Sequence, residues 1–151
     1  MNTGLPMILL AALLAMPVGC TRSISDRNLN LVDPAEAVVL VEGRKKLLGL
    51  AGTMTGVWVD PRGDRAYREG HIPGAIHLPF QELAVQQQRL RGYDVLIVYG
   101  TSVQDDLAAG MSKRLLELRF KDVRTLRGGL RAWTRAGFEL ETGDPRPDSQ
   151  P

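Results

Sequence analysis

Cysteine is almost absent: Cys20 is the single one among 151 residues. This excludes an intrachain disulfide, and because Cys20 closes an apolar leader, the rest of the chain carries no thiol. Only two histidines occur, and without a cysteine partner they make no metal-ligand set, so we predict neither a metal site nor a cofactor. An excess of one charge is also missing, since 19 basic and 17 acidic residues leave a formal net charge of +2. That balance argues against nucleic acid or an acidic membrane surface as a partner.

What is present is the composition of one globular domain, with 44% hydrophobic and 24% charged residues. A chain of 151 residues is long enough for one domain with a buried core and too short for two ordinary ones. We divide it into a leader (1–20), a polar tether (21–30), a domain (31–140) and a solvated, disordered tail (141–151).

The leader contains an uncharged apolar run from Met7 to Met16, which has the length of a signal peptide rather than of a membrane span. The run ends in Pro17-Val18-Gly19-Cys20, which resembles a bacterial lipobox, in which the cysteine becomes the lipid-modified N-terminus. This resemblance implies export and a lipid anchor at Cys20, on the outer membrane facing the periplasm if the cell is Gram-negative. An ordinary cleaved signal peptide, which gives a soluble periplasmic protein, and an uncleaved N-terminal anchor are the alternatives.

Within the domain, hydrophobic periodicity predicts alternating helices and strands. We expect a helix from Asp33-Pro34 and an insertion over 44–56. A helix over 80–90 should turn Leu83, Ala84 and Leu90 inward. The strands are expected at 57–59, 76–78, 95–99 and 123–126, and the remaining helices at 64–69, 105–119 and 130–137.

Two stretches resemble the signatures of the rhodanese-homology family. The first has an Asp-x-Arg strand end followed by the turn Gly-His-Ile-Pro-Gly-Ala at 70–75, and the second is Leu-x-Gly-Gly-Leu-x-Ala-Trp. This resemblance implies a small α/β fold with a mostly parallel central sheet flanked by helices. The signature residues are Asp60, Arg62, Gly70, His71, Pro73, Gly74, Gly128, Gly129 and Trp133.

In active members of that family the central strand ends in a cysteine, whose thiolate takes sulfur from a donor such as thiosulfate and forms a persulfide. Here the strand 95–99 is followed by Gly100, and an oxygen nucleophile cannot carry a persulfide. We therefore predict no catalytic residue and no enzyme activity. The loop remains a candidate for binding a small anion through Gly100, Thr101, Ser102, Val103, Gln104 and Asp105.

His71 and His77 lie in the rigid turn and the strand that follows it, and we predict hydrogen-bonded structural roles for both. The favoured function is a catalytically inactive rhodanese-like domain that acts as a binding or structural and regulatory module in the cell envelope, with a protein partner. The alternative is a sulfurtransferase-related enzyme of the envelope, in which a partner supplies the missing cysteine.

Overall fold

A computed structural model of the chain describes residues 24–43 and 55–144. The described part contains a five-stranded sheet in the order β1-β5-β4-β2-β3, and every pairing in it is parallel. The mostly parallel sheet expected from the sequence is confirmed. The strands are β1 (Asn30–Val32), β2 (Gly56–Asp60), β3 (Ile76–His77), β4 (Val95–Val98) and β5 (Asp122–Leu126).

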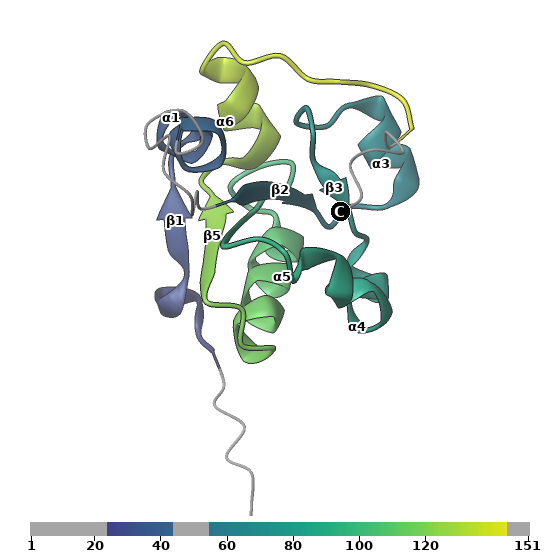
Figure 1. Cartoon of the computed structure of the whole chain (residues 1–151). Helices are drawn as coiled ribbons and strands as arrows, with labels where there is room; N and C mark the ends of the chain where they lie inside the picture. The colour runs from purple at the N-terminus through teal and green to yellow at the C-terminus, as the bar shows by residue number, and fades with distance from the viewer. Residues whose placement is uncertain (1–23, 44–54, 145–151) are drawn as a thin grey trace, which may run out of the picture.

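Helices cover both faces of this sheet, as Figure 1 shows. On one face lie α1 (Pro34–Val38), its π-helical continuation η2 (Val39–Gly43), and α6 (Gly129–Arg135). On the other lie α5 (Asp106–Glu117) and α4 (Leu83–Gln86), which stands between the 3-10 turns η3 (Phe80–Glu82) and η4 (Gln87–Leu90). Helix α3 (Asp64–Glu69) connects β2 to β3 at the edge of the sheet.

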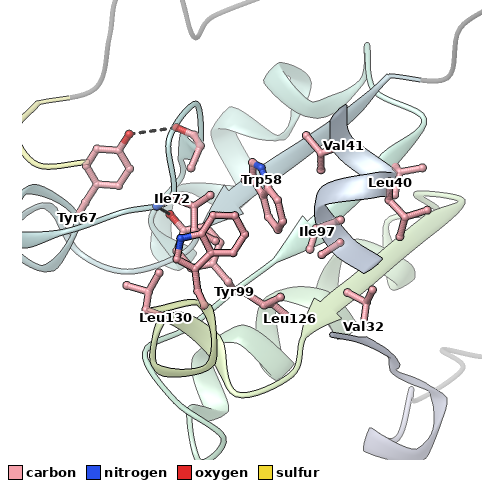
Figure 2. Close-up of a cluster of buried hydrophobic side chains, with 14 residues drawn as sticks. Val32, Leu40, Val41, Trp58, Tyr67, Ile72, Ile97, Tyr99, Leu126 and Leu130 are labelled. Atoms are coloured by element: carbon pink, nitrogen blue, oxygen red, sulfur yellow. Dashed lines mark hydrogen bonds between the residues drawn. The ribbon is translucent and has the colours of Figure 1, made fainter. Parts of the chain in front are cut away.

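Each face has its own apolar core, because alternate residues of the parallel strands point to opposite faces. Trp58 and Ile97 point toward α1 and α6, whereas Val59 and Val98 point toward α4 and α5. Figure 2 shows the first of these cores, with Trp58 and Ile97 among its side chains. In this core Trp133 of α6 meets Trp58 edge to face, with ring centroids 5.1 Å apart. Trp133 is buried against this face of the sheet, with 5% of the residue exposed.

The helix expected over 80–90 is instead broken into 3-10, α and 3-10 segments. Leu83 and Leu90 are buried as predicted, but Ala84 is exposed, and the prediction for it was wrong. A 3-10 turn rotates the chain by more per residue than an α-helix does, so a period of 3.6 loses register across such a segment.

The N-terminal edge of the domain starts earlier than the boundary at residue 31. Ser25 caps the 3-10 turn η1 (Asp26–Asn28), and Lys113 of α5 lies 2.8 Å from the Asp26 carboxylate. Strand β1 then begins at Asn30 and pairs with β5. The second half of the expected tether is therefore part of the fold. A strand of three residues is too short to show a period, and pairing with a distant strand makes it.

The C-terminal boundary differs as well. Residues 139–144, which we call the C-terminal strap, return to the domain instead of forming a solvated tail from 141. Backbone hydrogen bonds of 2.8 Å join Glu141 and His71 in both directions, and the Gly143 amide donates to the Arg68 carbonyl. The Asp144 carboxylate accepts from Arg68 at 2.7 Å. Polar composition suggested solvation, but these hydrogen bonds and ion pairs hold an exposed segment in place.

Several predictions fall outside the described residues: the leader with Cys20, the first residues of the tether, most of the 44–56 insertion and the tail beyond 144. Within the described residues no helix is both long and apolar enough to cross a membrane.

Candidate functional site

The carboxyl end of β2 carries the two signature residues Asp60 and Arg62. Arg62 forms a bidentate pair with Asp60, with Nε at 2.9 Å from Oδ1 and Nη2 at 2.6 Å from Oδ2. Both side chains are almost fully buried, Asp60 at 0% and Arg62 at 7% exposure. Nη2 also donates to the carbonyl of Gly70 at 2.7 Å. The pair thus fixes the start of the 70–75 turn against the end of the strand.

Tyr99, directly after β4, continues this buried polar cluster. Its hydroxyl accepts a hydrogen bond from the Ile72 amide at 3.2 Å and is also bonded to Asp60. Burial raises the pKa of Tyr99 well above its ordinary value, and the negative charge of Asp60 raises it further. Burial works against the charge of Arg62, yet its hydrogen bond and attraction to Asp60 raise the pKa of Arg62 overall. Tyr99 therefore stays neutral and Arg62 stays charged over the physiological range.

Both histidines contact the ring of Tyr67 in α3. The His71 ring stacks on it at a centroid distance of 3.8 Å and the His77 ring at 4.3 Å. His71 Nδ1 bonds the Tyr67 carbonyl and His77 Nε2 bonds the Arg62 carbonyl, both at 2.9 Å. The two histidines are hydrogen-bonded, as the sequence predicted. The turn between them needs glycine at Gly74, where φ is +75°, whereas Gly70 is in an extended conformation that other residues also adopt.

A shallow pocket of about 200 Å³ opens beside this stack, lined by Asp64, Tyr67, Arg68 and His77. Its charged groups are already engaged with one another or with the strap: Arg68 lies 3.8 Å from Asp64 and 2.7 Å from Asp144. Among the described residues, no group of three or more His, Cys, Asp or Glu side chains is placed to hold a metal ion.

The loop 100–105 connects β4 to α5 and is clamped onto the start of α6. The amides of Leu130 and Arg131 donate to the carbonyls of Gly100 and Thr101, at 2.9 and 3.1 Å. The backbones approach so closely here that a Cβ on Gly129, where φ is +55°, would collide with the Gly100 carbonyl oxygen. The signature pair Gly128-Gly129 and the loop are therefore brought together by the fold, although 23 positions or more separate them in the sequence.

Asp105 occupies the space in front of Gly100. A Cβ built on Gly100 would lie 2.5 Å from Asp105 Oδ2 and 2.8 Å from Asp105 Cβ. The carboxylate accepts hydrogen bonds from the amides of Thr101 at 2.5 Å and Leu107 at 3.1 Å. Asp105 is the N-cap of α5, and nothing in the sequence indicated its contact with Gly100, because capping alone explains an aspartate before a helix. Val103 at the tip of the loop is 81% exposed.

A family model for the rhodanese-like domain matches residues 44–136, more than half of the chain. The chain belongs to the rhodanese-like domain family. Its signature residues gather at one end of the sheet, where the 70–75 turn and the 100–105 loop lie. The rhodanese-like fold is also that of solved structures similar to it.

A curated relative, an HTH-type transcriptional regulator from Mycobacterium tuberculosis, is 32% identical over 87 residues, which are 58% of this chain and 38% of that protein. A thiosulfate sulfurtransferase from Pseudomonas aeruginosa matches 76% of this chain and 20% of its own at 23% identity and a TM-score of 0.61. A Bacillus halodurans protein matches 77% of this chain and 79% of its own at 27% identity and a TM-score of 0.60. This rhodanese-like chain thus spans a minor part of the first two proteins.

Proposed function

We propose that this rhodanese-like domain is non-catalytic and serves as a binding or structural module of the cell envelope. One observation carries the proposal: the second residue after the central strand β4 is Gly100, and the Asp105 carboxylate lies against it. Rhodanese chemistry needs a thiolate that attacks the outer sulfur of a donor such as thiosulfate. The S–S bond of the donor then breaks, sulfite leaves, and the sulfur stays on the thiolate as a persulfide. Neither residue supplies a sulfur atom for that step.

The neighbouring hydroxyls do not replace the thiol. A hydroxyl nucleophile requires an adjacent base, and the nearest side-chain acid or base, Asp105, is already bonded to the Thr101 and Leu107 amides. His71 and His77 contact Tyr67 and backbone carbonyls in the 70–75 turn region. This arrangement supports a loop that retains the family backbone without the family reaction.

The test is thiocyanate formation from thiosulfate and cyanide by the purified protein, with an active rhodanese assayed in parallel. We expect no turnover above the rate without protein. Turnover by the wild type would refute the proposal, and the nucleophile would then have to lie outside the 100–105 loop.

A second proposal concerns the location of the domain in the cell and rests on Cys20. We propose that this cysteine is lipid-modified after export and anchors the domain at the membrane. Its position four residues past the end of the apolar run supports this, together with the absence of any other cysteine in the sequence. Metabolic labelling with a fatty-acid analogue should label the wild type and fail to label Cys20→Ser. Labelling that persists in the variant would exclude a lipid anchor at this residue.

A module that performs no chemistry acts through a partner, and we propose that the partner is a protein. The M. tuberculosis relative is named for transcriptional regulation, and the stretch matching this chain is only 38% of it, which supports a modular role. Co-purification from membrane extracts of cells with and without the protein tests this proposal. A sulfurtransferase among the bound proteins would favour the alternative in which a partner supplies the cysteine. A clean monomer would count against both.

A further inference from the structure

The space that a side chain at position 100 would fill is already taken by atoms of the chain itself. The Cβ of any residue at this position would lie 2.5 Å from Asp105 Oδ2 and 2.8 Å from Asp105 Cβ. A Cβ atom does not approach a non-bonded carbon or oxygen atom this closely, so either the aspartate or the backbone would have to move. The backbone of Gly100 itself is not in the left-handed region, so its conformation alone does not require glycine.

Hydrogen bonds hold the Asp105 carboxylate in this position. Oδ2 accepts from the Thr101 amide at 2.5 Å, and Oδ1 accepts from the Leu107 amide at 3.1 Å. The second bond caps helix α5, which favours a negative charge at its first turn. The positive charge of Arg62 also attracts the carboxylate.

The backbone of Gly100 and Thr101 is also held in place, by hydrogen bonds to the start of α6. The Gly100 carbonyl accepts from the Leu130 amide at 2.9 Å, and the Thr101 carbonyl accepts from the Arg131 amide at 3.1 Å. Gly129 lies against the Gly100 carbonyl so closely that even a Cβ on it would collide. Position 100 is therefore enclosed between the start of α6 and the side chain of Asp105.

We propose that Gly100 and Asp105 form a coupled pair, in which the aspartate carboxylate is an internal plug that fills the nucleophile's side-chain space and binds the loop amides in its place. This inference deepens the proposed non-catalytic function and rests on it. The loss of the reaction is then twofold: the thiol is gone, and the loop is closed by the chain's own carboxylate. Restoring a side chain at position 100 requires that Asp105 be removed as well.

A double-mutant cycle on the full chain tests the coupling, with stability read from urea unfolding. Gly100→Ala should raise the unfolding equilibrium constant about fivefold or more, since the methyl group displaces the Asp105 cap. In the Asp105→Gly background, which removes the three atoms nearest to that methyl group, Gly100→Ala should cost nothing or stabilise slightly. Asp106→Gly is the matched control, because Asp106 is the next residue along and is exposed. In that background the full cost should remain. An equal cost of Gly100→Ala in all three backgrounds overturns the proposal.

The chemical arm of the experiment introduces the thiol. In Gly100→Cys the new thiol must share its space with a carboxylate, which disfavours the thiolate. In Gly100→Cys/Asp105→Gly the loop amides are free to stabilise it. Alkylation of the introduced thiol by iodoacetamide at pH 7, followed by peptide mass spectrometry so that Cys20 is resolved separately, should be about tenfold faster in the double variant. Equal rates contradict the plug. Wild-type turnover of thiosulfate would instead refute the non-catalytic function and would leave the unfolding cycle as it is.

Discussion

Removing the guanidinium of Arg62 isolates a buried charge, and its effect on stability can be worked out from the structure. In Arg62→Met the apolar part of the side chain is kept while three hydrogen bonds are lost, two to Asp60 and one to the Gly70 carbonyl. Asp60 is 0% exposed, so its carboxylate has no access to water. It keeps the hydrogen bond from the Arg62 backbone amide and its bond to the Tyr99 hydroxyl.

Breaking a buried pair by removing one partner costs about 3–5 kcal/mol, because an uncompensated charge is left inside. Proteins of this size have a total stability of about 5–15 kcal/mol, so the variant should be close to its unfolding threshold at room temperature. Urea unfolding followed by circular dichroism measures this change, and the dependence of the unfolding free energy on urea should stay constant if only the pair is affected.

Two matched variants separate the charge effect from simple loss of packing. Asp60→Asn/Arg62→Met removes both charges and should be more stable than Arg62→Met, although it deletes one more ionic group. Arg65→Met breaks the exposed pair of Arg65 with Glu69 and should leave the unfolding midpoint unchanged. A loss below about 1 kcal/mol in Arg62→Met, or a double variant no better than the single one, would refute this reasoning.

Three further predictions concern other parts of the fold. Trp133→Ala should cost about 3–5 kcal/mol in urea unfolding, since a large buried aromatic side chain is deleted; a change below about 1 kcal/mol would contradict its packing. Gly74→Val should cost about 1–3 kcal/mol because φ is +75° there, whereas Gly92→Val, at a turn without positive φ or close contact, should cost less; wild-type melting of both variants would count against the turn. The pKa of Tyr99 is raised in the folded state. The contribution of neutral Tyr99 to the unfolding free energy should therefore be fully present below about pH 10 and be lost as the pH rises above it. Tyr99→Phe should lose less stability over that alkaline interval, and identical slopes would argue against burial of the hydroxyl.

Local signals in the sequence predicted much of the architecture. The unbroken apolar run at 95–99 contains several β-branched residues and predicted a central strand, and its first four residues form β4 at the centre of the sheet. The turn at 70–75 and helix α3 before it were also predicted, because proline, glycine and charge pattern act within a few residues. The prediction of a regular helix over 80–90 was wrong because its outcome does not depend on local signals alone. Which of its residues reach the sheet depends on how the 3-10 segments rotate the chain, and no local period encodes that.

The ends of the domain show the same limit. Strand β1 has three residues and exists because β5 pairs with it, while the strap at 139–144 is held by His71 and Arg68, which lie about 70 positions earlier. The polar composition of the strap predicted a solvated tail. Nothing in the strap itself indicated that His71 and Arg68 bind it. Contacts between residues far apart in the chain are decided by the assembled sheet and by its edges.

At the candidate site, the sequence by itself determined which functional group is missing. A glycine stands where the thiol is needed, and no other residue after Cys20 carries sulfur in a thiol. Only the tertiary structure decided what fills the space, because the distance between Gly100 and the Asp105 carboxylate depends on how the loop is clamped to α6. Residue type fixes which reactions a side chain can perform, whereas the folded backbone fixes which atoms occupy the same volume.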